Sequence, residues 1–340
     1  MDSQDLDTAR RDADLRWRFC VAPMMDWTDR HCRYFHRQLS RRARLYTEMI
    51  TTGALLHGDA RRHLQFDAAE HPVALQLGGS EPGELAQAAR LGERAGYDEI
   101  NLNCGCPSER VQRGAFGACL MAEPALVADC IKAMRDAVAV PVTVKHRIGI
   151  DRIEDYGFVR EFVGVLSGAG CEVFIVHARN AWLKGLSPRE NREVPPLRYE
   201  VVRRLKHDFP ASRFVLNGGI ASLDEALRQS AGLDGVMLGR AAYHDPFLLA
   251  SVDAAFFDES APAPSRAEVV ARMSDYLERE CRAGATPRHI VQHMHGLFQG
   301  LRGARRWRRA LSDARQLESA GAGILTQLLR ETGQPLRDAA

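Results

Sequence analysis

Residues 142–177 read VTVKHRIGIDRIEDYGFVREFVGVLSGAGCEVFIVH, and the fold prediction starts from this stretch. A short β-branched run at 142–146 precedes a helical apolar pattern over 156–166 and a second short apolar run at 173–177. A strand, a helix and a second strand in this order predict a βαβ unit with parallel strands. Both runs end in polar residues, Lys145-His146 and His177, where the predicted strands meet their loops.

The same pattern recurs on both sides of this segment. Further strands are predicted at 19–22, 45–49, 73–77, 99–103, 214–217 and 235–238. Further helices are predicted at 84–95, 124–138, 199–209 and 222–227. Eight strands alternating with helices predict an α/β protein with a (β/α)8 TIM barrel, which typically takes roughly 250 residues. A doubly wound sheet is the alternative, but no GxGxxG follows the first strand.

The pattern changes after residue 257. Residues 258–265, DESAPAPS, have the composition of a linker. Beyond them we predict only helices, over 266–280, 287–299 and 306–320. The expected organisation is a flexible segment at 1–16, a TIM-barrel catalytic domain at 17–257, the linker at 258–265 and an all-α domain at 266–340.

The composition narrows the class of protein. The chain has 340 residues, of which 45% are hydrophobic, and its mean hydropathy is −0.28. No apolar run approaches the roughly 18 residues of a membrane helix, so we expect no membrane contact. The first sixteen residues lack the apolar stretch of a signal peptide, and the 8 cysteines are scattered. We therefore expect a cytoplasmic protein without disulfides.

The net charge of +2 is unevenly distributed. Residues 1–265 carry 33 basic and 36 acidic side chains, whereas residues 266–340 carry 13 and 8. Five arginines surround Trp307, namely Arg302, Arg305, Arg306, Arg308 and Arg309. Such a run is usually a solvated helix face, but with a stackable aromatic it favours a phosphate backbone as partner. Lys184, Arg189 and Arg192 add positive charge in the loop after strand 173–177.

Polar residues gather at the ends of the predicted strands, where TIM barrels carry their chemistry. Asn217-Gly218-Gly219 and Gly239-Arg240 follow the last two strands, and glycines there allow a phosphate to approach backbone N–H groups. Tight turns are the alternative for either motif alone. Lys145 has three possible roles: stabilising negative charge on a cofactor, forming a Schiff base, or pairing with a carboxylate.

Cys104-Gly105-Cys106-Pro107 follows the fourth strand. Buried free cysteines are usually inert, and no second CxC or CxxC supplies further ligands, so we expect no metal. A thiol in a glycine-containing loop at a barrel mouth is better interpreted as a nucleophile or a proton donor. His289 and His293 lie one helical turn apart, but without further ligands we interpret them as ordinary histidines.

These motifs closely resemble those of the tRNA-dihydrouridine synthases, and within them the bacterial subfamily acting on uridines 20 and 20a of the D-loop. The resemblance covers residues 17–335. The segments that carry it are VAPMMDWTDR (21–30), YTEM (46–49), ALQLGG (74–79), EINLN (99–103), GCPS (105–108), GLSPRENRE (185–193), NGGI (217–220) and GLFQG (296–300).

The resemblance implies an FMN-dependent barrel with a C-terminal helical domain, NADPH as co-substrate and tRNA as partner. It implies that FMN is held by Pro23, Met24, Met25, Gln76, Lys145, His177, Asn217, Gly218, Gly219, Gly239 and Arg240. Cys106 would be the catalytic acid, giving a proton to uracil C5 after flavin N5 gives hydride to C6. With the basic residues singled out above, the tRNA contacts would be Asn103, Lys184, Arg189, Arg192, Arg302, Arg305 and Arg306. We expect a monomer.

Two positions depart from the family pattern. Cys104 stands where an aliphatic residue is usual, so the catalytic role is assigned to Cys106, directly before the proline. His146 replaces a small hydroxyl residue and is expected to face away from the barrel interior. Two other classes of function stay open from the residues alone. One is a flavin or aldolase-type barrel that acts on a small metabolite, with Lys145 as a Schiff-base lysine and no nucleic-acid partner, and the other is a non-catalytic RNA-binding protein on a decayed barrel.

Overall fold

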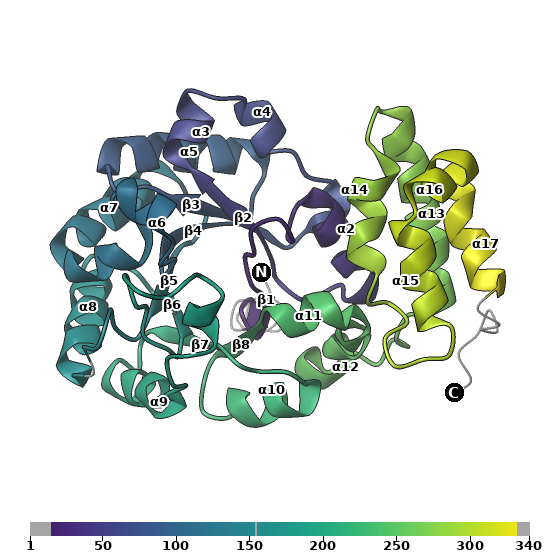
Figure 1. The fold of residues 1–340 in the computed structure, drawn as a ribbon. Helices are drawn as coiled ribbons and strands as arrows, with labels where there is room; N and C mark the ends of the chain where they lie inside the picture. The colour runs from purple at the N-terminus through teal and green to yellow at the C-terminus, as the bar shows by residue number, and fades with distance from the viewer. Residues whose placement is uncertain (1–14, 154, 332–340) are drawn as a thin grey trace, which may run out of the picture. The chain divides into compact units, whose positions relative to one another are not determined.

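The computed structural model describes residues 15–153 and 155–331 (Figure 1). Nearly all of the predicted flexible segment 1–16 and the end of the predicted helical domain, 332–340, lie outside the described residues. The central element is one sheet of eight parallel strands. Its strands are β1 (Phe19–Val21), β2 (Leu45–Thr51), β3 (Val73–Gly78), β4 (Glu99–Cys104), β5 (Val142–Arg147), β6 (Val173–His177), β7 (Arg213–Asn217) and β8 (Gly235–Leu238).

The sheet closes on itself as a barrel. Each strand pairs with its neighbours in chain order, and β1 returns to pair with β8 through Cys20 and Met237. Between β1 and β2 the contact is short: the Val21 N–H donates to the Arg44 carbonyl, and the Arg44 N–H donates to the Phe19 carbonyl, both over 2.9 Å. The predicted TIM barrel is therefore confirmed.

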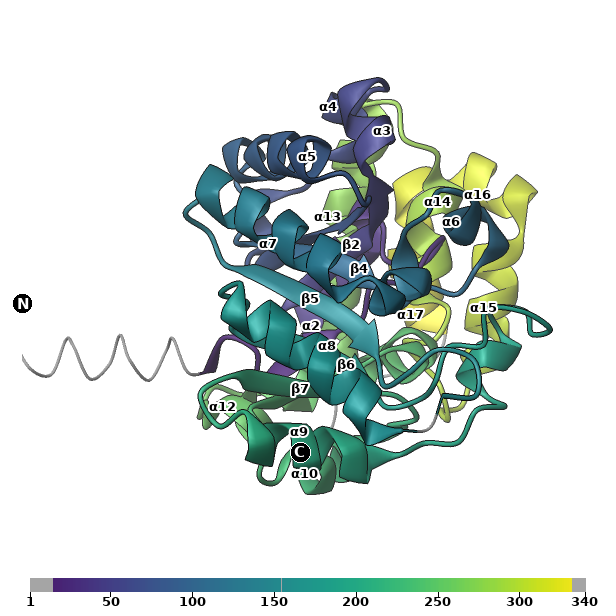
Figure 2. The same cartoon turned by 90° about the vertical axis from the view of Figure 1, so that its left-hand side faces the viewer.

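Helices follow the strands and surround the ring, as Figure 1 shows in a view along the barrel. They are α3 (Thr52–Leu56), α4 (Ala60–His63), α5 (Pro82–Ala95), α6 (Glu109–Arg113), α7 (Pro124–Ala137), α8 (Tyr156–Gly168), α9 (Tyr199–Asp208) and α10 (Leu223–Ser230). Figure 2 shows α7 and α8 running along β5. Local sequence explains several ends: Ser222 caps α10 by accepting from the Glu225 N–H, and Gly96 ends α5 with a φ of 99°.

The barrel interior holds a buried apolar cluster together with buried polar side chains that extend to its mouth. Cys20, Tyr46, Ile175, Val215 and Met237 belong to one buried cluster inside the ring. Alternation along parallel strands sends every second side chain inward, so the polar strand-end residues lie above this cluster.

The described chain divides into two compact units by its contacts. The barrel unit runs to Met25 and from Arg44 to Gly239, and the helical unit combines Asp26–Ala43 with the chain from Arg240 onward. The helical unit contains α2 (Arg30–Leu39), α11 (Arg240–His244), α12 (Val252–Phe257), α13 (Arg266–Arg282), α14 (Pro287–Val291), α15 (Ala304–Ser312), α16 (Ala314–Ala320) and α17 (Ile324–Glu331).

Helix α2 joins the helical unit through specific side chains. Arg30 pairs with Glu280 over 2.5 Å, the His31 ring hydrogen-bonds the Tyr276 hydroxyl over 2.8 Å, and Tyr34 stacks on Tyr276. This grouping by contacts differs from the linear division expected around residues 258–265, because α2 lies more than two hundred residues earlier in the chain.

Two predicted tail helices are interrupted. The helix predicted over 287–299 is regular only in α14, after which the chain continues in 3-10 and other turns. The helix predicted over 306–320 is divided at Asp313, whose carboxylate accepts from the N–H groups of Arg315 and Gln316 and so begins α16. Within residues 15–153 and 155–331, no helix has the length and apolar character that a membrane span needs.

Candidate functional site

The loop after β4 presents one cysteine and buries the other. Cys104 is fully buried, and burial raises its pKa well above the ordinary value, with Cys130, Cys171 and Cys119 nearby adding to the shift. Cys106 is only partly buried. The two thiols therefore differ in environment, because Cys104 belongs to the core whereas Cys106 is partly accessible.

Asn103 holds the loop that carries Cys106. Its side-chain oxygen accepts hydrogen bonds from the backbone N–H groups of Gly105 and Cys106, each over 3.0 Å. Its side-chain nitrogen donates to the Gln76 oxygen over 2.9 Å, and both side chains are buried. The structure thus brings the predicted residues Asn103, Gln76 and Cys106 together.

Lys145 and Asn217 meet above the apolar core. The Lys145 ammonium donates to the Asn217 side-chain oxygen over 3.0 Å, and the Asn217 nitrogen donates to the Met237 carbonyl. Burial, assisted by the neighbouring Arg147 charge and opposed by Cys106, lowers the pKa of Lys145 to about 7. A lysine in this setting is poised to gain charge stabilisation from an anionic ligand.

His177 is an uncharged imidazole beside several cations. Burial lowers its pKa well below the ordinary value, and the charges of Arg147 and Lys145 act in the same direction. His146 lies on the other side of β5, fully buried against Phe162 of α8. The expectation that His146 faces away from the barrel interior is confirmed.

Arg147 is a residue that the sequence analysis did not single out. It is 4% exposed, and its guanidinium donates to the Gly105 carbonyl over 3.1 Å and to the carbonyls of Asn180 and Asn191. It therefore ties the Cys106 loop to the loop that follows β6. The two-residue period Thr143, Lys145, Arg147 on β5 was the available signal, because these positions share one face of the strand.

Backbone N–H groups without partners lie at the ends of β7 and β8 in the described part of the chain. Gly218 and Gly219 have φ values of 117° and 74°, and a Cβ on Gly218 would lie 2.7 Å from the His177 ring. The Tyr199 hydroxyl fixes this turn by donating to the Gly218 carbonyl over 2.7 Å. Among the described residues, the N–H groups of Gly218, Gly219 and Gly239 form no hydrogen bond. Three unpaired donors on adjacent strand ends form a suitable phosphate cradle.

The chain after β1 contributes apolar side chains. Pro23 and Met24 are partly buried, Met24 packs against the interior cluster, and Met25 is 56% exposed. These three predicted residues all belong to the barrel unit.

The loop between β6 and α9 is well anchored despite its length. The buried Asn191 amide donates to the Trp182 carbonyl over 2.9 Å and accepts from the Trp182 N–H over 2.8 Å. Its predicted tRNA-facing residues Lys184, Arg189 and Arg192 are all exposed. A cavity of about 330 Å³ beside the loop is lined by Asp151, Arg152, Asn180, Trp182, Pro196 and Arg198.

The helical unit carries the remaining predicted residues. Arg240 begins α11, Arg302 precedes α15, and Arg305 and Arg306 are exposed on α15. Trp307 was expected to be a stackable surface aromatic, and this is wrong. Its ring is fully buried, packs on Phe298 and donates to the Met294 carbonyl over 2.8 Å, because it occupies the apolar side of α15.

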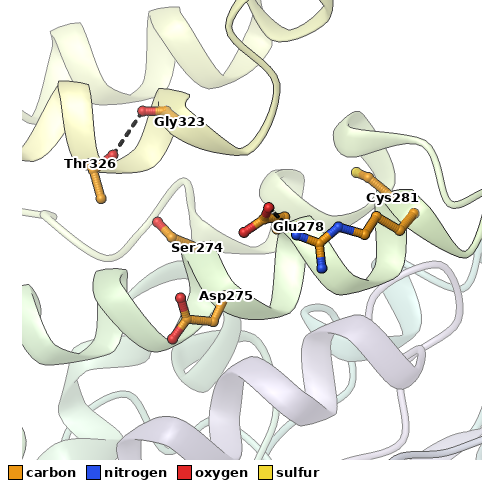
Figure 3. Close-up of a pocket in the computed structure, with 7 residues that line it drawn as sticks. Ser274, Asp275, Glu278, Cys281, Gly323 and Thr326 are labelled. Carbon is orange, nitrogen blue, oxygen red and sulfur yellow. Dashed lines mark hydrogen bonds and ion pairs between the residues drawn. The ribbon is translucent and has the colours of Figure 1, made fainter.

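Other features of the helical unit carry no predicted site residue. An open cavity of about 640 Å³ is lined by Ser274, Asp275, Glu278, Cys281, Arg282, Gly323 and Thr326 (Figure 3). Within it, Glu278 pairs with Arg282 and Thr326 donates to the Gly323 carbonyl. In the part of the chain that the structure describes, no three His, Cys, Asp or Glu side chains are arranged to hold a metal ion.

Comparison with known proteins agrees with this geometry. The sequence profile of the dihydrouridine synthase (Dus) family matches residues 20–332. A tRNA-dihydrouridine(20/20a) synthase of Pseudomonas putida is 61% identical over 295 residues, covering 87% of this chain and 88% of that protein. The protein of the same name from Escherichia coli K12 is 56% identical over 320 residues, covering 93% of this chain and 92% of its own length. This chain belongs to the dihydrouridine synthase family.

Proposed function

We propose that this enzyme reduces uridines 20 and 20a of tRNA to 5,6-dihydrouridine, with FMN bound in the barrel and NADPH as reductant. The observation that carries the proposal is the position of Cys106, on a loop held by Asn103 and Arg147 and close enough to Lys145 to influence its protonation. The names of the two relatives given above specify the same uridine positions, 20 and 20a.

The residues at the barrel mouth suit FMN. The unpaired N–H groups of Gly218, Gly219 and Gly239 match a phosphate, and Arg240 follows directly in the chain. Gln76, Lys145 and His177 would contact the flavin ring and the ribityl chain, and Asn217 would help to hold the phosphate. The apolar Pro23, Met24 and Met25 would lie under the flavin ring. When bound, FMN supplies the hydride that uracil C6 receives.

The protein's own residues handle the proton and the charge. Reduction at C6 builds negative charge toward C5 and O4 of the uracil, and Cys106 donates its thiol proton to C5. The resulting thiolate is reprotonated from water. Lys145 and Arg147 place two positive charges beside this position and stabilise the anionic species. Asn103 keeps the thiol in place.

The tRNA reaches this site with its target base out of the helical stack, a requirement for chemistry on a base. Lys184, Arg189 and Arg192 on the β6–α9 loop, and Arg302, Arg305 and Arg306 in the helical unit, would contact the phosphate backbone. Asn103 would contact the uridine. The enzyme acts as a monomer in the cytoplasm. All eight cysteines, each within the described residues, are free thiols, which suits a reducing compartment.

Paired cysteine variants test the proposal. Cys106→Ala is expected to abolish dihydrouridine formation in tRNA, measured by mass spectrometry, while the purified protein stays yellow with FMN. Loss of a general acid typically costs about 10²–10⁴-fold in rate. Cys104→Ala is the matched control, because Cys104 lies two residues earlier but in the core, and this variant should retain activity. Exchange of the two phenotypes, or a colourless wild-type protein, would contradict the proposed function.

A further inference from the structure

A line of buried polar side chains runs from the floor of the barrel to the Cys106 loop. It begins at Glu99, the first residue of β4, which is fully buried. From Glu99 it passes through four side chains, here called the polar relay: Thr143, Asn101, Gln76 and Asn103. All four are 8% exposed or less.

The donor and acceptor roles in this line follow from Glu99. The Arg44 guanidinium lies 3.2 Å from one Glu99 oxygen, and the Trp17 indole N–H donates to the same oxygen over 2.7 Å. The hydroxyls of Tyr46 and Thr143 donate to the other oxygen, over 2.8 and 2.5 Å. Because all four of these groups direct donors at the Glu99 oxygens, the single hydroxyl proton of Thr143 is committed to Glu99.

Each further bond then has one possible direction. Thr143 can only accept from the Asn101 nitrogen, over 2.8 Å, which leaves the Asn101 oxygen to accept from the Gln76 nitrogen over 2.7 Å. The Gln76 oxygen accepts from the Asn103 nitrogen, and the Asn103 oxygen is thereby turned toward the N–H groups of Gly105 and Cys106. A flipped amide anywhere in this line would set two donors or two acceptors against each other, at a cost that burial increases.

We propose that Glu99, Thr143 and Asn101 are positioning residues for Cys106, because they fix the orientation of the Asn103 amide that holds the cysteine loop. The inference rests on the proposed function, since it explains how the proton donor is kept in place. Asn101 and Thr143 are too deep to touch substrate, and they act only through Gln76 and Asn103.

The barrel supplies a matched pair of variants. Thr143→Val removes the hydroxyl that links Glu99 to the relay with little change in shape, and Tyr46→Phe removes an equally buried hydroxyl from the same Glu99 oxygen. Tyr46 has no link to the Cys106 loop through the relay. Both variants lose one hydrogen bond to Glu99, so only a positioning role separates their effects on turnover.

Thr143→Val is expected to lower kcat about tenfold with an unchanged KM for tRNA, since small misplacement of a catalytic group is costly. The rate of flavin reduction by NADPH should stay unchanged, because it does not use Cys106. The alkylation rate of Cys106 by iodoacetamide, followed by peptide mass spectrometry, should differ from wild type. Thr143→Ser should restore both quantities, and Tyr46→Phe should leave both as in wild type.

The outcomes separate the two proposals. Equal turnover and equal Cys106 alkylation in Thr143→Val and Tyr46→Phe would overturn the relay, even if Cys106→Ala is inactive. An active Cys106→Ala variant would overturn the role of Cys106 instead. If Thr143→Val fails to fold, hydrogen exchange of the wild-type holoenzyme decides. The Gly105 and Cys106 amides must exchange slowly although they lie in a loop, and fast exchange would refute the relay.

Discussion

Lys145 shows how the barrel mouth changes the chemistry of a single side chain. Burial lowers the pKa of its ammonium to about 7, and among the described residues its one hydrogen-bond partner is the neutral amide of Asn217. A lysine in water keeps its charge far above this pH. In the ligand-free site, Lys145 therefore carries a full charge only below neutral pH, and a bound anion would restore that charge at higher pH.

The affinity of the ligand-free protein for FMN should consequently weaken with rising pH. We expect the dissociation constant to rise about tenfold between pH 8 and pH 9, because the binding-competent charged fraction falls by that factor. Quenching of flavin fluorescence on binding measures it. Lys145→Met should bind weakly with no such slope, and Lys132→Met, at an exposed lysine of α7, should keep it. A wild-type slope in Lys145→Met would contradict this account.

Individual site residues could be predicted where chemistry marks them. His177 and Asn217 end apolar strands, Lys145 lies near the end of one and Cys106 just beyond another, and a polar residue at such a position is conspicuous in sequence. Arg147 could have been found from its two-residue spacing from Lys145 on the same strand. Asn191 could not be recognised, because it bonds backbone groups of a loop whose path the sequence does not reveal. Trp307 was misinterpreted because its neighbours in sequence are arginines, whereas on the helix it shares a buried face with Ala304 and Ala310, three residues away on either side.

At the scale of elements, the two faces of α15 explain why Trp307 is buried among arginines. Arg305 and Arg306 are exposed, whereas Ala304, Trp307, Ala310 and Leu311 are buried. The helix is therefore amphipathic, with Trp307 anchoring it and arginines on its outer side. The basic run is a surface of charge without an aromatic platform, so any contribution to RNA binding is electrostatic.

Replacing Arg305 and Arg306 with alanine should weaken tRNA binding and reduce its dependence on salt. Each lost phosphate contact lowers the slope of log K against log salt by about 1. Filter binding between 50 and 200 mM salt measures this slope, and the FMN spectrum should not change. Arg90→Ala with Arg94→Ala, on the exposed face of α5, is the control of equal charge. An unchanged slope would remove α15 from the tRNA surface.

Strands and outer helices could be predicted more closely than the tail helices. The ends of β6 and β8 coincide with the predicted ranges, because each apolar run is bounded by polar or glycine residues. In the tail, Asp313 looked like an ordinary helical position within 306–320. Only its side-chain bonds to the next turn reveal that it ends one helix and begins another.

At the scale of the whole molecule, buried histidines of the helical unit couple its stability to pH. Burial lowers the pKa of His36 to about 3, with the nearby His293 charge adding to the effect, and burial lowers that of His31 to about 4. Both are depressed below the value of 6.5 expected when the chain is unfolded. The unfolded chain therefore binds protons that the folded unit rejects, and stability falls as pH decreases below about 6.5.

Thermal unfolding should reflect this loss. At pH 5 each such histidine costs about 2 kcal/mol relative to neutral pH, so the Tm should drop clearly between pH 7 and pH 5. His36→Gln should have a lower Tm at pH 7 but a smaller drop. His63→Gln, at an exposed position of α4, should behave like wild type. Circular dichroism at both pH values measures the difference, and an equal drop in all three proteins would disprove the linkage.

The fold class could be predicted from the sequence because eight short apolar strand patterns alternate with helical patterns along the chain. The membership of α2 in the helical unit could not, since helices on a barrel and helices of another unit have the same amphipathic pattern. The contacts of Arg30, His31 and Tyr34 with α13 decide it, and they join residues far apart in the chain.

This long-range membership has a consequence for synthesis of the chain. Arg30 and Glu280 are 250 residues apart, so α2 leaves the ribosome long before the helix that completes its surroundings. Until then the rings of His31 and Tyr34 have no Tyr276 to pack against, and a nascent or prematurely terminated chain exposes them. A fragment starting at residue 258 lacks α2 in turn. The helical unit is thus encoded by two separate parts of the gene, for residues 26–43 and for the chain from residue 240 onward. A gene fusion that transfers only the second part lacks α2.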